Sequence, residues 1–237
     1  MKKFKQFVFI IMLFTAFTAS AQVGIGTITP NAKAVLDITS TTQGLLPPRM
    51  DSTARNAITT PPAGLIIYNT SINALQCYNG TNWYSTVHFI GESYGGGIVF
   101  YVYDNGPHGL IAATADQSTG IQWYNGSNNV TNAVRDGISA GIFNTERIIS
   151  NQGGGAYAAQ ICANYKGGNY GDWYLPSKYE LNLLYQQKTV VGGFANGNYW
   201  SSSEVDNYYA WFQSFSNGLQ TNLNKYYSVY VRAIRAF

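Results

Sequence analysis

Two proline pairs, Pro47-Pro48 and Pro61-Pro62, divide the first third of this 237-residue chain. Proline has a fixed φ angle and no backbone donor, so a helix or central strand cannot continue through either pair. From Gln22 to about Val87 the sequence is also rich in Thr, Asn and Gly and poor in apolar residues. Such a segment cannot bury a large core alone, and we expect it to gain burial by oligomerising or by packing on its neighbour.

Short elements are predicted within this segment. Strands are expected at 23–26 and 64–68, and a short helix at 52–58. The Asn79-Gly80 turn, between 75–78 and 82–84, is typical of a β-hairpin. We assign residues 22–88 to a small β-rich stalk or attachment module.

The first 21 residues, Met1 to Ala21, match a secretory signal peptide. A basic start is followed by an apolar run from Phe7 to Phe14 and by the small residues Ala19-Ser20-Ala21. The run is short for a spanning helix, and an uncleaved anchor is the alternative. We expect a secreted or cell-surface protein without a membrane span after cleavage.

Removal of this leader changes the charge balance. The chain has 14 Lys and Arg against 11 Asp and Glu, and three of those lysines (Lys2, Lys3, Lys5) lie in the leader. The remaining chain is close to neutral, which argues against a nucleic-acid partner because phosphate binding needs clustered cations.

Residues 89–237 show the pattern of an α+β domain with a mostly antiparallel sheet and two or three helices. Strands are predicted at 98–103 and 109–113 around a Gly-Pro turn, and helices at 145–150 and 156–165. A further helix follows Pro176, where Ser177 and Glu180 fit a capping box and Gly192-Gly193 ends the pattern. Strands and polar turns then run from Tyr199 to the final strand at 229–235.

No motif in the sequence predicts catalysis, a cofactor or a metal. The two histidines, His88 and His108, have no ligand spacing, and no G-x-S-x-G elbow or phosphate loop is present. Asp172 and Glu180 could form an acid pair, but Glu180 is better explained as a helix cap. The two cysteines after the leader, Cys77 and Cys162, are expected as separate thiols, with a disulfide as the alternative. We predict a protein that is not an enzyme.

Tyrosine and asparagine are concentrated between Asn196 and Tyr230. Tyrosine offers a rigid contact surface with a polar tip, and antibody loops use such residues for recognition. The segment is therefore either an exposed recognition face or a polar sheet edge with turn-forming asparagines. Alternation places Trp211, Gln213 and Phe215 inward, so that Phe212 and Ser214 point outward.

Several blocks of the C-terminal region resemble the C-terminal domain family of the Legionella collagen-like adhesin (Lcl). They are GDWYLPSKYEL from Gly171, YWSSSE from Tyr199, Ala210-Trp211, Phe215-x-Asn217-Gly218 and VRAIRAF from Val231. The resemblance implies a C-type-lectin-like fold, related to formylglycine-generating enzymes, and extracellular ligand binding with glycosaminoglycan-like polysaccharides as a precedent. The calcium-site tripeptides of animal C-type lectins and the reactive cysteine pair of the formylglycine-generating enzymes are missing.

We expect the framework of this region to serve folding. Trp173 and Trp200 are predicted core anchors, and Ser201 to Ser203 are predicted to bond loop backbone. Arg232 and Arg235 are expected to pair with Glu180 or Glu204.

The same stretch is similar to the variable region of retroelement-diversified proteins. In those proteins asparagine codons are randomised at their adenines, which can produce Asn, Tyr, Phe, Ser, Leu or Thr among other residues. The residues at ten positions here belong to that set. We predict these as ligand-binding residues, whether actively diversified or a fixed binding face: Asn207, Tyr208, Tyr209, Phe212, Ser214, Leu219, Thr221, Leu223, Tyr226 and Tyr227.

The N-terminal segment has a likeness of its own. Val23-Gly24-Ile25-Gly26, Gly44-Leu45-Leu46-Pro47-Pro48 and Gly64-Leu65-Ile66-Ile67-Tyr68 resemble a module of secreted Bacteroidota-type proteins and are similar to phage tail-fibre-like chains. This implies an attachment segment, with a homotrimer as the expected assembly. The leading hypothesis is a non-catalytic adhesin or lectin-like protein for an extracellular glycan or surface protein. The alternative is a structural fibre or matrix subunit whose C-terminal domain caps an oligomer.

Overall fold

The computed structural model describes residues 22–85, 87–104 and 106–237, so the predicted signal peptide lies outside the described residues. The chain forms two compact units that divide between Pro48 and Arg49. None of the helices in these ranges is long and apolar enough to cross a membrane.

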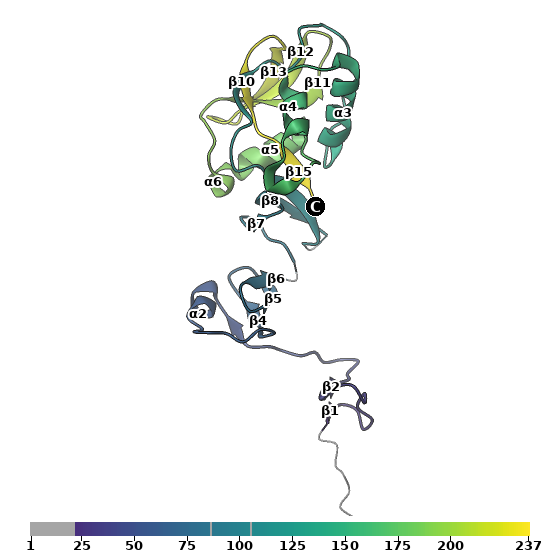
Figure 1. Ribbon diagram of the computed structural model, residues 1–237, viewed down its shortest axis with the longest axis vertical. Coiled ribbons are helices and arrows are strands. Elements are labelled where there is room, and N and C mark those ends of the chain that lie inside the picture. The colour runs from purple at the N-terminus through teal and green to yellow at the C-terminus, as the bar shows by residue number, and fades with distance from the viewer. Residues whose placement is uncertain (1–21, 86, 105) are drawn as a thin grey trace, which may run out of the picture. The chain divides into compact units, whose positions relative to one another are not determined.

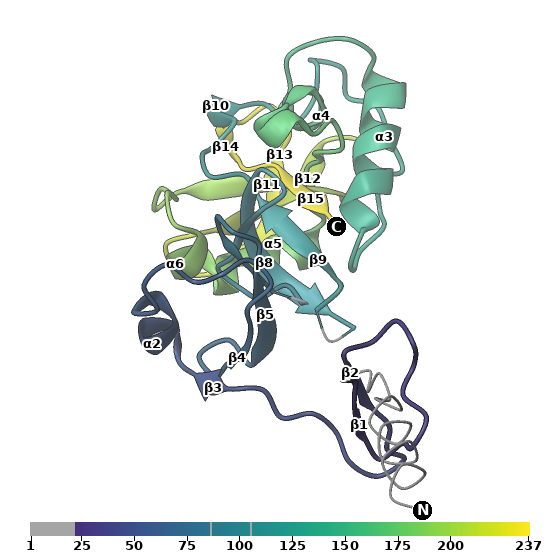
Figure 2. The same cartoon turned by 60° about the horizontal axis from the view of Figure 1, so that its bottom comes forward.

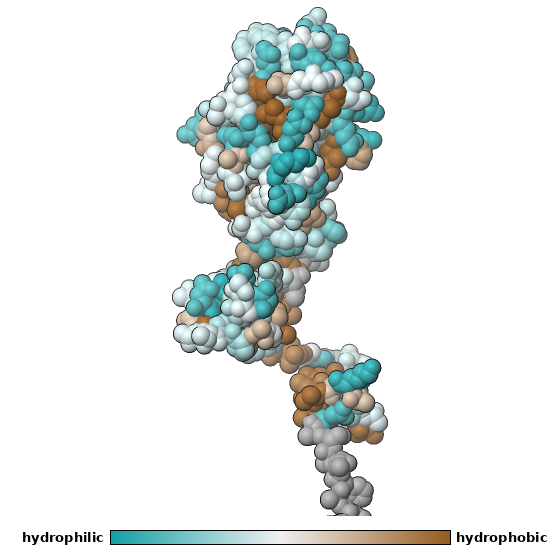
Figure 3. Space-filling model, viewed as in Figure 1, coloured by the Kyte–Doolittle hydropathy of each residue, from teal (hydrophilic) through white to brown (hydrophobic). Residues whose placement is uncertain are grey.

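The first unit is a small two-stranded element. Strands β1 (Val23–Ile25) and β2 (Leu36–Ile38) pair in parallel. Val23, Ile25 and Leu36 are each more than half exposed. Figure 3 shows hydrophobic residues on the surface of this unit. Because these apolar side chains are exposed, the two strands do not enclose a hydrophobic core.

The second unit begins with a four-stranded sheet that contains the predicted hairpin. Its order is β3 (Arg49–Met50), β4 (Ile66–Asn69), β5 (Ala74–Tyr78) and β6 (Trp83–Ser85). Between β3 and β4 lies the short helix α2 (Ser52–Asn56), whose first turn is capped by the Asp51 carboxylate. The turn at Asn79-Gly80 joins β5 to β6, because Gly80 adopts the positive φ that this turn needs. The hairpin prediction is confirmed.

The C-terminal region is built on two sheets (Figures 1 and 2). A four-stranded sheet has the order β15 (Ile234–Ala236), β9 (His108–Ala112), β8 (Gly97–Tyr103) and β7 (Ser93–Tyr94). A five-stranded sheet has the order β10 (Ser118–Ile121), β14 (Val229–Val231), β11 (Asn198–Glu204), β12 (Tyr209–Ser214) and β13 (Gln220–Asn224). In these two sheets only β11 and β14 pair in parallel. The expected final strand at 229–235 is therefore two strands, one in each sheet.

Four α-helices and one 3-10 helix pack beside these sheets: α3 (Ala140–Gln152), α4 (Ala158–Asn164), η1 (Gly167–Asn169), α5 (Lys178–Gln186) and α6 (Lys188–Val191). The capping box at Ser177 and Glu180 is confirmed, with both of its hydrogen bonds present. The predicted two or three helices are four, because the helical stretch after Pro176 breaks at Gln187 into α5 and α6. The predicted α+β class with a small β-rich N-terminal region is confirmed.

The core has two parts. One contains Trp123, Trp173 and Trp200 and is covered by α3 and α4, and the other lies against α5 around Phe100 and Phe215. Trp173 and Trp200 are almost wholly buried, as predicted.

The expected arginine pairing is wrong. Arg232 pairs with Asp116 at 2.7 Å and Arg235 with Asp172 at 2.8 Å, because Glu180 and Glu204 are occupied by backbone donors and Lys225. Both cysteines are free thiols, with Cys162 buried and Cys77 half-buried.

Candidate ligand-binding site

The pairing of β12 with β13 decides where most of the predicted site residues point. Directly opposed residues share a face of an antiparallel sheet. Tyr209 faces Asn224 and Trp211 faces Asn222, whereas Phe212 faces Thr221. One face therefore carries Tyr209 and Trp211, and the other carries Phe212, which is 8% exposed and belongs to the main core.

The expectation that Phe212 and Ser214 point to solvent is wrong. Both are buried, and so are Gln213 and Phe215, whereas Trp211 is only half-buried. The physical reason is that β12 lies inside the sheet, where the core covers one face along the strand and α5 covers the other face at the Gln213 end. The alternation of residues along a strand predicts which side chains share a face, but it does not predict whether one face or both are buried.

The tyrosines, in contrast, gather at one end of the β12–β13 pair. Tyr208, Tyr209, Tyr226 and Tyr227 are 40–48% exposed, and we call these four the tyrosine surface. The rings of Tyr226 and Tyr227 lie 4.4 Å apart between centroids. The hydrogen bond between their side chains raises the pKa of Tyr226, and the nearby Tyr209 acts in the same direction.

A buried ion pair lies beneath the tyrosine surface. The Nζ atom of Lys225 is 2.6 Å from Oε1 of Glu204, and neither side chain has appreciable solvent exposure. The same Nζ donates to the carbonyl oxygens of Asp206 and Asn129 at 2.7 and 3.4 Å. It also lies 4.6 Å above the centre of the Trp123 ring. Burial lowers the pKa of Lys225, against the favourable contacts with Glu204.

This ion pair joins three loops. The Glu204 carboxylate accepts hydrogen bonds from the backbone N–H groups of Thr131 and Asn132, at 2.8–2.9 Å. The backbone of Lys225 accepts from Trp123 N–H and donates to the Tyr208 carbonyl. Tyr208, Tyr226 and Tyr227 therefore project from loops that are held by charge-assisted bonds, and Tyr209 projects from the adjoining first residue of β12. Such bonds are about twice as strong as neutral ones.

The ten predicted site residues do not converge on one place. Asn207 lies half-buried beside the tyrosine surface, and Thr221 and Leu223 are half-buried on the core side of β13. Leu219 is exposed at the opposite end of β12, which at six residues is about 17–20 Å long. Five of the ten, the tyrosines and Asn207, can share one ligand.

Sequence reasoning missed Lys225 and Glu204. Lys225 is the sole charged residue between Asn207 and Val231. A lone lysine in a long uncharged stretch indicates a specific partner, because an unpaired charge is rarely buried. That signal could have identified Lys225, but the sequence does not show which acid it meets.

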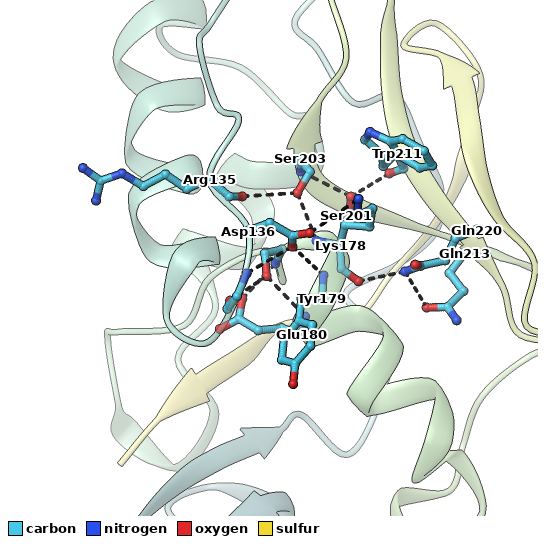
Figure 4. A network of polar contacts seen from close by, with 12 residues as sticks. Arg135, Asp136, Lys178, Tyr179, Glu180, Ser201, Ser203, Trp211, Gln213 and Gln220 are labelled. Carbon is cyan, nitrogen blue, oxygen red and sulfur yellow. Dashed lines mark hydrogen bonds and ion pairs between the residues drawn. The ribbon is translucent and has the colours of Figure 1, made fainter. Parts of the chain in front are cut away.

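Glu180, which the sequence analysis considered as half of an acid pair, has a structural role. Glu180 is buried and accepts from the backbone of Ser139, Gly141 and Ser177 and from the Tyr174 hydroxyl. Burial raises its pKa against these hydrogen bonds. Figure 4 shows Glu180 within a polar network at the start of α5. Within the described ranges no group of three or more His, Cys, Asp or Glu residues could hold a metal ion.

Comparison with known families gives two matches. Residues 24–105 match a phage-tail-like trimerisation region, and residues 112–235, more than half of the chain, match the Lcl C-terminal domain. No match was found among curated proteins. The two families together indicate a surface or adhesin-like protein. The chain belongs to the Lcl C-terminal domain family, and its N-terminal region is similar to a phage-tail-like trimerisation region.

Proposed function

We propose that this protein is exported and acts outside the cell as an adhesin, with its tyrosine surface binding a glycan or another surface molecule. The observation that carries this proposal is the group of four exposed tyrosines at the end of the β12–β13 pair, beside the buried Lys225–Glu204 pair. The proposed binding is non-covalent and reversible.

A tyrosine side chain suits this role because it buries a large area while only two torsion angles become ordered on binding. Loops that are already rigid before binding lose less entropy when a ligand arrives. The Lys225–Glu204 ion pair reduces this entropy loss, because it holds the segments 129–132, 204–209 and 224–227 together before a ligand binds.

We further propose that residues 22–88 form a stalk that displays three copies of the domain at 89–237. The match to a trimerisation region supports this assembly. The exposed aliphatic side chains of β1 and β2 support it too, because a patch of that kind in a soluble protein marks an interaction site. Three linked domains would bind a surface with far greater avidity than one.

The test is binding by the mature chain, residues 22–237, in which Tyr208, Tyr226 and Tyr227 are changed to alanine. Binding to intact cells by flow cytometry and to a glycan array is expected to be lost. The melting temperature should change little because these side chains are exposed. Tyr170→Ala, a similarly exposed tyrosine in the C-terminal domain but outside the tyrosine surface, is the matched control and should bind normally. Unchanged binding by the triple variant would contradict the proposal.

We propose retroelement diversification only for the exposed part of the predicted set. Phe212 and Ser214 are buried, and randomising them would insert wrong volumes or unpaired polar groups into the core. Sequencing the flanking DNA of several isolates would test this. A near-copy of the codons for residues 199–235, differing at adenines and beside a reverse-transcriptase gene, is expected. Identical codons in all isolates without such a copy would indicate a fixed binding face.

A structural fibre or matrix subunit is the second candidate, and the trimerisation match favours it equally. The two functions differ in whether the C-terminal domain has a ligand. Light scattering on the mature chain would give its mass, and the cell-binding assay would give its affinity. A stable trimer that binds neither cells nor glycans would favour the fibre.

A further inference from the structure

The face of β12–β13 opposite the core is only half covered. At one end Gln213 and Gln220 are held against α5, through hydrogen bonds from Gln213 to Asn182 and from Gln220 to the Lys178 carbonyl. At the other end Tyr209, Trp211, Asn222 and Asn224 share the same face, and we call these four the aromatic strip. Tyr209 and Asn222 are exposed, and Trp211 and Asn224 are half-buried.

Trp211 differs from the three core tryptophans in its hydrogen bonding. The indole N–H groups of Trp123, Trp173 and Trp200 each donate to a backbone carbonyl at 2.8–3.1 Å. The Trp211 indole N–H donates to no acceptor among the described residues, and it is not among the buried atoms that lack a partner. It can therefore donate a hydrogen bond to a ligand. The amide of Asn222 is likewise free of partners within the described part of the chain.

The Trp211 ring is held in place by its surroundings. The Nζ atom of Lys178 lies 4.5 Å from the ring centre and 3.5 Å from Oδ2 of Asp136. The Trp211 carbonyl accepts from Ser201 Oγ at 2.8 Å, and the Lys178 backbone N–H donates to Ser203 Oγ at 3.0 Å. Figure 4 shows these residues linking the start of α5 to β11 and β12. A ring oriented in this way loses little freedom when a ligand stacks on it.

Unpaired charge near the strip is limited to one cation among the described residues. Lys178 is paired with Asp136, and the guanidinium of the neighbouring Arg135 lies 4.1 Å above the Phe143 ring without an acidic partner. A sulfated or otherwise polyanionic glycan would need several unpaired cations. The strip instead offers a flat aromatic surface, a free indole donor and primary amides, each of which can donate and accept.

We propose that the aromatic strip is a subsite for a neutral saccharide. One apolar face of a pyranose ring packs on Trp211, and ring hydroxyls bond to the Asn222 amide and the indole N–H. Tyr209 belongs to both the strip and the tyrosine surface, so the two form one continuous binding face. This inference rests on the proposed recognition function and adds the ligand class and a residue, Trp211, that alternation along the strand had predicted to point inward.

The experiment is a titration of the ¹⁵N-labelled mature chain with neutral trisaccharides of glucose, mannose and N-acetylglucosamine, and with heparin as the polyanionic probe. The indole N–H signal of Trp211 is expected to shift with at least one neutral sugar, at millimolar concentration, and not with heparin. Trp211→Ala and Asn222→Ala should each weaken that binding about tenfold or more, as truncation of a central contact does. Asn128→Ala, an exposed asparagine outside the strip, is the matched control.

Trp211→Phe keeps a ring but removes the indole donor, so it covers the case in which Trp211→Ala fails to fold. It should retain part of the affinity. If none of the neutral sugars shifts the Trp211 signal, or if Trp211→Phe and Asn222→Ala bind as tightly as the unchanged chain, the subsite is refuted. Loss of cell binding in the triple tyrosine variant alongside normal cell binding by the Trp211 variants would refute the subsite and leave the adhesin function standing.

Discussion

The Lys225→Met substitution tests the claim that a buried ion pair supports the tyrosine surface. Methionine fills much of the space of the lysine stem but removes the charge. Glu204 would then keep its bonds from Thr131 and Asn132 but lose its cation. Removal of one partner from a buried pair costs about 3–5 kcal/mol, because the other charge stays buried and uncompensated. For a domain of this size such a loss lowers the melting temperature by roughly 6–20 °C.

The double variant Lys225→Met/Glu204→Gln separates charge from packing. A glutamine at 204 can still accept from the backbone of Thr131 and Asn132 while carrying no charge. We therefore expect it to recover more than half of the stability that Lys225→Met loses. Urea unfolding followed by circular dichroism would measure all four proteins of the cycle. A loss below about 1 kcal/mol for Lys225→Met alone, the range of an exposed pair, would refute the reasoning.

Three further predictions follow from other parts of the molecule. Ile25→Asp in β1 should convert a trimer of the mature chain into monomers by light scattering, because three buried aspartates would face one another. A trimer that persists would place the interface elsewhere. Asp172 has a lowered pKa because Arg235 donates to it, so it stabilises the folded state above about pH 4 and this contribution is lost as the pH falls. Asp172→Asn should reduce the acid sensitivity of urea unfolding, by a small amount because the carboxylate is 58% exposed. Cys77 should react with a thiol reagent in the native protein and Cys162 only after unfolding, because burial raises the pKa of Cys162. Equal reaction rates would contradict this.

Local interactions are the part of this structure that sequence reasoning recovered. The capping box joins Ser177 to Glu180, three residues away, and the hairpin turn at Asn79-Gly80 joins neighbouring strands. In both cases the residues that interact are adjacent in the chain, so their types and spacing are sufficient. The alternation of aromatic residues along β12 also separated its two faces correctly.

Only the tertiary structure decided which surfaces are available to a ligand. Phe212 is buried because the core covers its face of β12, and the aromatic strip is open because α5 covers only the other end of the opposite face. Lys225 meets Glu204 from 21 residues away, and Arg232 meets Asp116 from 116 residues away. Pairings over such distances depend on how the sheets and helices pack, whereas a residue pattern records only the periodicity of one segment. The sequence by itself thus determined the elements and the residue types that could bind, and the packing of α5 and the core against β12 decided which of them reach the surface.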